Sequence, residues 1–183
     1  MFTLVQSGRE YYYKNKDLFT HIISIVCPDD DITPLHDKHI VVKFWDIDHE
    51  MTNKFRHYDV VSLDTVLKPV FKAEAWYFDC LTGDKPMRLL VHCDAGVSRS
   101  SSVSLGILWL ISSFVFSKMG PQEKDTLGCV KAHVEYRKEW CKNRVEEDCV
   151  GLRRFIDGRL NPGIIPNQAV LKHYRESLPY FPW

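Results

Sequence analysis

Apolar residues along the chain form short β-branched runs that alternate with longer stretches of helical spacing. The run His21–Val26 is apolar and β-branched and is followed by a turn cluster of one proline and three aspartates at 28–31, so a strand is expected there. Similar runs at 39–45 and 88–92 predict two more strands. The last is short and almost wholly apolar, which is typical of a strand inside a sheet.

Helical spacing occupies much of the chain between and after these strands. Residues 59–81 carry apolar side chains at helical intervals, and Pro69 among them must start, kink or break a helix, so this segment contains one helix or two. A central helix is expected at 100–117, directly after the last strand. Three further helical segments are expected at 126–143, 149–160 and 167–177.

Two regions of the chain bear on targeting and membrane insertion. The longest apolar stretch, 103–116, is interrupted by serines and is shorter than the ~20 residues of a membrane span, so it predicts a buried core helix. Near the start, Arg9 and Glu10 stand where a secretory signal needs an unbroken apolar run. We therefore expect neither a signal peptide nor a membrane partner.

Strands that alternate with helices predict an α/β fold with a central, mostly parallel β-sheet flanked by helices. The 183 residues suffice for one hydrophobic core and are too few for two comfortable domains, so a single domain spanning 1–183 is expected. Ligands of such sheets bind beyond the carboxyl ends of the strands. The loop that follows residues 88–92 lies at such an end.

Charge and cysteine content narrow the function classes. The 24 Lys and Arg residues balance 24 Asp and Glu residues, so no overall field favours nucleic acid or an anionic membrane, and any anion site must be local. The 6 cysteines are spread along the chain without the close pairing of a disulfide scaffold or a structural zinc site. A reducing, cytoplasmic location is expected, with no metal and no cofactor.

The sequence HCDAGVSRS, at 92–100, joins the last predicted strand to the central helix. A tight loop that opens a helix turns successive backbone N–H groups toward one point, where the helix dipole adds partial positive charge. Gly96 lets the backbone fold closely around a guest, and Arg99 offers a planar fork that suits two phosphate oxygens. The residues expected to bind this tetrahedral anion are Asp94, Ala95, Gly96, Val97, Ser98 and Arg99.

Cys93 enters the same field at the start of the loop, where the amide dipoles and Arg99 are expected to stabilise its thiolate. Ser100 can donate its hydroxyl to the sulfur, and His92 can orient the loop by bonding to its backbone. In the alternative interpretation, Cys93 is a plain core residue and Arg99 an ordinary helix cation. That alternative leaves an arginine on the unfavourable end of the helix dipole, whereas a bound anion accounts for it.

HCDAGVSRS resembles the HCxxGxxRS signature of the cysteine-dependent protein tyrosine phosphatases, and the short chain resembles their dual-specificity branch. The similarity extends from the strand at 21–26 through FWDID at 44–48 to IIPNQAVLKHY at 164–174, while 120–162 is longer and less similar. The resemblance implies that fold, with Cys93 as nucleophile in a phosphate-binding loop. It also implies hydrolysis of phosphotyrosine in proteins through a cysteinyl-phosphate, with phosphoserine and phosphothreonine left open.

Expelling an alkoxide or phenoxide from phosphorus requires a proton donor that the loop does not contain. Members of the resembled family carry an aspartate on a loop after an upstream strand, and the corresponding stretch here is FWDID. Asp46 and Asp48 alternate along one face, so spacing cannot choose between them. The resemblance favours Asp46, which ends the apolar strand, although no proline follows Trp45 as in the Trp-Pro-Asp form.

Several alternatives remain at the level of sequence. An RNA 5′-phosphatase would share the loop but needs a basic approach surface. A catalytically silent phosphopeptide-binding module would lack the cysteine, the arginine or the acid, and a sulfurtransferase gives no reason for the upstream aspartate. The loop also lacks the lysines of relatives that act on phosphoinositides, and Asp94 would repel surplus phosphates unless its side chain points away. Gln168, at the start of the last helix, is expected to be structural.

Overall fold

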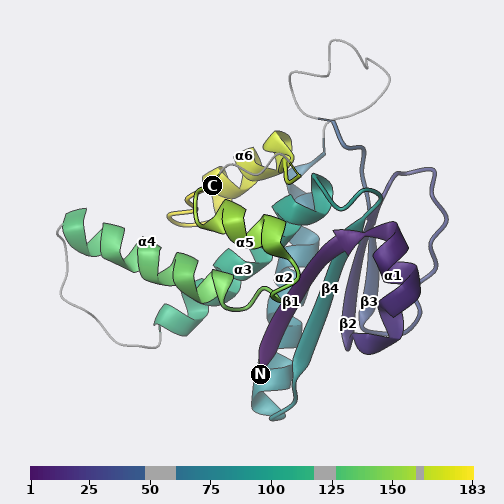
Figure 1. The fold of residues 1–183 in the computed structure, drawn as a ribbon, viewed down its shortest axis with the longest axis horizontal. Helices are drawn as coiled ribbons and strands as arrows, with labels where there is room; N and C mark the ends of the chain where they lie inside the picture. The colour runs from purple at the N-terminus through teal and green to yellow at the C-terminus, as the bar shows by residue number, and fades with distance from the viewer. Residues whose placement is uncertain (48–60, 118–126, 160–162) are drawn as a thin grey trace.

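A parallel sheet forms the centre of the protein (Figure 1). The computed structural model describes residues 1–47, 61–117, 127–159 and 163–183. In these residues the strands are β1 (Phe2–Gly8), β2 (His21–Val26), β3 (His39–Lys43) and β4 (Met87–Cys93). They lie in the order β1-β4-β2-β3, and each neighbouring pair is parallel. The predicted α/β fold with a mostly parallel sheet is confirmed.

The three predicted strands are present, and a fourth was missed. β2 has the predicted bounds, β3 ends at Lys43 rather than at 45, and β4 is one residue longer at each end than 88–92. The missed strand is β1, which pairs with β4 from Phe2 opposite Met87 to Gly8 opposite Cys93. β1 therefore delivers its carboxyl end directly beside the candidate loop.

The described helices follow the predicted order, with two additional short ones near the start. They are α1 (Arg9–Asn15), the short 3-10 helix η1 (Lys16–Leu18), α2 (Leu63–Thr82), α3 (Arg99–Ser117), α4 (Leu127–Lys142), α5 (Val150–Ile156) and α6 (Gln168–Ser177). α2 is one helix that continues through Pro69, so this proline neither starts nor ends it. Its side chain is buried, as are those of Val66 and Val70 in the same helix.

The two faces of the sheet are covered unequally. α1 lies on one face, where Tyr12 joins Val5, Ile22 and Leu90 in a small cluster. The opposite face carries the larger core, to which α2, α3 and α6 contribute. By length and composition α3 could cross a membrane, but 67% of that span is buried within the protein, as expected of a core helix.

All four strands point the same way, so their carboxyl ends meet at one edge of the sheet. Gly8 lies opposite Cys93, and Val26 lies opposite Lys43. The segments that follow these residues therefore converge, and the candidate residues of the sequence analysis lie on them.

Candidate active site

Cys93 is the last residue of β4 and is almost fully enclosed, with 2% of its surface exposed. Its Sγ lies 3.2 Å from the Oγ of Ser100, which belongs to the first turn of α3 and is fully buried. The strand, the loop and the helix thus bring these two side chains together as predicted. This distance fits a hydrogen bond between the sulfur and the hydroxyl. It is longer than an O–H···O bond because sulfur has a larger radius than oxygen.

The loop between them turns at Gly96, whose backbone has φ +72°. A Cβ atom at this position would lie 2.4 Å from the backbone N of Gly8 and 2.6 Å from the carbonyl carbon of Ser7. The loop consequently packs directly against the end of β1. This arrangement requires glycine both for its conformation and for its space.

Arg99 is buried at the start of α3, and only 4% of its surface is exposed. Its Nη1 donates to the carbonyl of Phe44 at 3.0 Å and contacts Cys27 Sγ at 3.4 Å, while Nη2 donates to Asp94 at 2.5 Å. Among the described residues, the buried Nε has no hydrogen-bond partner. This N–H is therefore available to donate a hydrogen bond to an oxyanion that enters the site.

The side chain of Asp94 points toward the loop and contacts Arg99. It therefore does not point away, which was the arrangement in which Asp94 would not repel additional phosphates. Its carboxylate is paired with Arg99 and, on its other oxygen, with Arg9, which follows the end of β1. Arg9 also binds Asp30 through two bonds, of 2.6 and 3.2 Å, and this contact lowers the pKa of Asp30. Two guanidinium groups therefore offset the negative charge that Asp94 brings to the loop.

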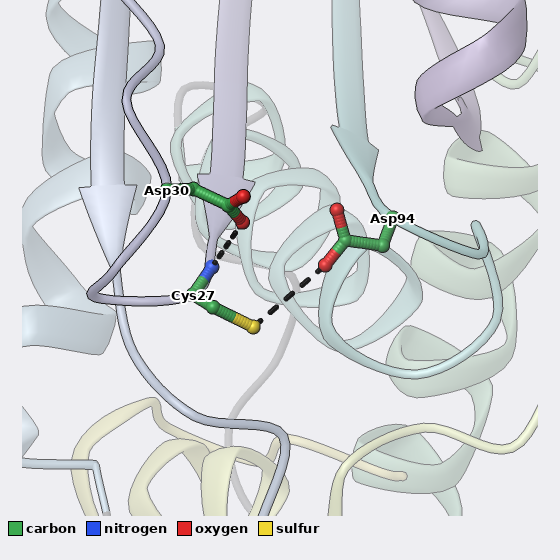
Figure 2. Close-up of side chains that lie close together, drawn as sticks. All are labelled: Cys27, Asp30 and Asp94. Carbon is green, nitrogen blue, oxygen red and sulfur yellow. Dashed lines mark hydrogen bonds between the residues drawn. The ribbon is translucent and has the colours of Figure 1, made fainter.

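Cys27, Asp30 and Asp94 lie close together beside this loop (Figure 2). Their potential ligand atoms are all within 4.8 Å of one another, a spacing that a metal ion could span. Both carboxylates are, however, already bound by Arg9 or Arg99. A metal ion would have to displace these cations, so we assign the cluster to the arginine network and not to a metal.

Asp46 reaches the loop from the segment after β3. Its Oδ1 accepts hydrogen bonds from Ser98 Oγ at 2.6 Å and from Asn167 Nδ2 at 2.9 Å, and Oδ2 lies 4.0 Å from Arg99 Nε. The side chain is 39% exposed, so a leaving group can approach it. The alternative candidate, Asp48, lies outside the described residues.

Asn167 was not predicted as a site residue. Its Oδ1 accepts a hydrogen bond from the backbone N of Val170 at 3.1 Å and so caps α6, while its amide nitrogen holds Asp46. The only signal in the sequence is an asparagine at a helix start, which ordinarily indicates a cap alone. Gln6 of the missed strand β1 and Arg9, the first residue of α1, were also not predicted.

His92 belongs to a buried polar chain, and an interaction with the backbone of Cys93 at the start of the loop also raises its pKa, against the larger effect of burial, which lowers it. Its Nε2 lies 2.6 Å from Ser24 Oγ, which lies 2.7 Å from His39 Nε2, and the ring stacks on Tyr12 with centroids 4.2 Å apart. His39 Nδ1 accepts from the backbone N–H of Leu35 at 3.0 Å, so a neutral His39 carries its proton on Nε2. Ser24 then donates to His92, whose own proton lies on Nδ1.

We expect the protein to lose stability as the pH falls from 6.5 toward 4. Burial is the main cause that lowers the pKa of both His39 and His92 from 6.5 to about 4. Between these values the unfolded chain binds more protons than the folded one, so the free energy of unfolding falls as the pH falls. Each histidine should cost about 2 kcal/mol at pH 5, which urea denaturation at pH 7 and pH 5 measures.

The variant His39→Gln should reduce this pH dependence, because it removes one of three buried histidines whose pKa is lowered to about 4, His21 being the third. The matched variant His173→Gln, on α6 and outside this polar chain, should leave it largely unchanged. Equal stability of the wild type at pH 7 and pH 5 would contradict the interpretation that these rings are buried in the neutral form.

Comparisons with known proteins give similar structures but no sequence relative. No protein-family model matches the chain, and no curated protein matches its sequence. The phosphatase domain of Yvh1 from Chaetomium thermophilum is 20% identical, with a TM-score of 0.47 over 96% of this chain and 90% of that one. Human DUSP28 is 13% identical, with a TM-score of 0.46 over 94% of this chain and 89% of that one.

A third similar structure is OH1 from the Orf virus, described as a tyrosine phosphatase with triple substrate specificity. It is 13% identical, with a TM-score of 0.48 over 94% of this chain and 80% of that one. The Yvh1 domain and OH1 are described as phosphatases. The identities are too low to transfer an activity, so the function has to be inferred from this chain's own residues.

Proposed function

We propose that this protein is a phosphatase that hydrolyses phosphotyrosine in proteins through a covalent cysteinyl-phosphate. One observation carries the proposal: a buried cysteine and a buried arginine flank a glycine loop, and an aspartate with a 39% exposed side chain is held at the rim of that loop. Among the described residues the Nε of this arginine makes no hydrogen bond. These three side chains are a nucleophile, an oxyanion receptor and a proton donor arranged around one space.

In the first step, the thiolate of Cys93 attacks phosphorus and forms the P–S bond while the P–O bond to the leaving group breaks. Asp46, protonated, gives its proton to the departing oxygen. Ser98 and Asn167 both bond to one carboxyl oxygen of Asp46, which leaves Oδ2 for this transfer. Arg99 and the loop amides hold the equatorial phosphate oxygens, and Nη2 exchanges Asp94 for phosphate.

In the second step, water attacks phosphorus and the P–S bond breaks. Asp46, now ionised, accepts a proton from this water, and inorganic phosphate leaves. Cys93 departs as a thiolate, beside the hydroxyl of Ser100 at 3.2 Å. Every proton and electron pair is accounted for by these side chains and water.

Phosphorylated proteins are the substrates that fit this site best. Asp94 and Asp30 place carboxylates beside the loop whose charges are already matched by Arg9 and Arg99, so no excess of positive charge remains there for a polyphosphate. This balance disfavours a polyphosphorylated lipid head group or an RNA 5′ end. We infer a cytoplasmic role from the free cysteines.

The proposal predicts that the wild type hydrolyses p-nitrophenyl phosphate, phenyl phosphate and a phosphotyrosine peptide, and that Asp46→Asn lowers kcat by about 10²- to 10³-fold on the last two. The loss should be smaller on p-nitrophenyl phosphate, because p-nitrophenolate departs with little help from an acid. A residue with a merely structural role would affect all three substrates alike. Steady-state kinetics over pH 5–8 measures these differences.

Asp79→Asn, at an exposed position on α2, is the matched control and should keep full activity. A crippled Asp48→Asn together with a normal Asp46→Asn would move the acid two residues along the chain. A wild type that hydrolyses none of the three substrates would overturn the proposed function itself.

A further inference from the structure

Gln6 is a polar residue of β1 that follows Leu4 and Val5, and only 8% of its surface is exposed. Its Nε2 donates one hydrogen bond to the carbonyl of Gly96 at 2.6 Å and another to Ser100 Oγ at 2.8 Å. The side chain thus reaches both the turn of the candidate loop and the hydroxyl beside Cys93. Packing within the strand does not explain a glutamine at this position, because an apolar side chain could fill the same buried space.

The partners of Gln6 fix the direction of these bonds. A backbone carbonyl can only accept, so the amide must present its nitrogen to Gly96, and that nitrogen carries two hydrogens. The second hydrogen goes to Ser100 Oγ, which therefore acts as an acceptor toward Gln6. In the thiol form the S–H of Cys93 donates to Ser100 Oγ at 3.2 Å. Once the sulfur is a thiolate it can only accept, and the hydrogen of Ser100 is then free to bond to it.

Burial makes this direction consequential. Ser100 is fully enclosed and Cys93 is 2% exposed, so bulk water is not in contact with the hydroxyl to reorient it. A hydroxyl that accepts one hydrogen bond also becomes a better donor, since the bonds in a chain polarise one another. The chain from Gln6 through Ser100 accordingly ends on the sulfur with a proton directed at it.

We propose that Gln6 is a positioning residue: acting through Ser100, it directs a hydroxyl proton onto the sulfur of Cys93 and so stabilises the thiolate. This inference rests on the proposed function for its importance to turnover, because the same bond assists the thiolate both before attack and as it leaves the cysteinyl-phosphate. The contact with Gly96 fixes the amide, and the contact with Ser100 performs the positioning.

The test measures how readily the Cys93 thiolate forms, and it does not require that the protein hydrolyse any substrate. The rate at which iodoacetamide alkylates Cys93 is followed by mass spectrometry from pH 4 to pH 9 in the full-length protein. Gln6→Met keeps the length of the side chain and removes both donors. It should move the alkylation profile to higher pH and lower the rate at pH 6 by about five- to tenfold, the effect of one lost hydrogen bond.

A double-mutant cycle with Ser100→Ala separates positioning from support of the loop. If Gln6 acts through Ser100, then Gln6→Met should shift the profile much less in the Ser100→Ala background than in the wild type. An equal shift in both backgrounds, or none in the wild-type background, overturns the inference. Gln168→Met, on the exposed start of α6, is the matched control and should leave the profile unchanged.

Thermal melting shows whether Gln6→Met is folded. If this variant is unfolded, Gln6→Glu, whose side chain has the shape of glutamine, is used in its place. Gln6→Glu loses the donors and adds a negative charge, so its shift should have the same direction and be larger. If Gln6 and Ser100 are coupled in the alkylation experiment but the wild type cleaves no phosphate ester, the proposed function is overturned and the positioning role of Gln6 remains. If the wild type is active but the two residues are not coupled, the positioning role is overturned and the proposed function remains.

Discussion

Cys93→Ser is expected to abolish hydrolysis of aryl phosphates, with kcat falling by about 10⁴-fold or more. The replacement keeps the size of the side chain but leaves a hydroxyl that does not ionise near neutral pH. The described contacts of Cys93 offer only the Ser100 hydroxyl, which is no base that could activate a serine. Steady-state kinetics on p-nitrophenyl phosphate measures the loss.

The same variant should still bind oxyanions, since Arg99 and the loop are unchanged. Calorimetric titration with tungstate tests this, and Cys80→Ser, at a buried cysteine in α2, is the matched control that should keep its activity. Turnover by Cys93→Ser at even a tenth of the wild-type rate would contradict the covalent mechanism. Loss of tungstate binding would show that the substitution had disturbed the loop itself.

The sequence was informative where the signal is local. β2 and β4 are apolar and lie inside the sheet, so their runs of apolar residues are continuous and were recognised. β1 is an edge strand, and Gln6 interrupts its short apolar run, so its pattern resembles an irregular segment. Its identity as a strand comes from its pairing with β4, which lies far away along the chain.

The same distinction applies to the candidate site. Cys93, Arg99 and Ser100 are adjacent in sequence, and one loop with one helix brings them together. The partners of the loop come from distant segments: Arg9 pairs with Asp94, Gln6 bonds Ser100, and Asn167 holds Asp46. Their roles follow from how the strands are ordered, which no spacing rule for a single segment contains.

Gly96→Ala is expected both to destabilise the protein and to remove its activity. The new methyl group would meet backbone atoms of Ser7 and Gly8 at 2.4 to 2.9 Å, and the residue would keep its positive φ of +72°. Backbone atoms cannot move aside as a flexible side chain does, so either β1 or the loop must shift. We expect a loss of about 2–4 kcal/mol in the free energy of unfolding, measured by urea denaturation.

Gly158→Ala separates the two causes, because Gly158 has the same φ of +72° but no atom of the described residues lies within 4 Å of the new methyl group. This control should cost only about 1 kcal/mol, the price of the backbone conformation, and keep full activity. The difference between the two variants is therefore a measure of the contact between the loop and the end of β1. Equal losses of stability, with activity retained in both, would mean that the loop does not depend on β1 for its shape.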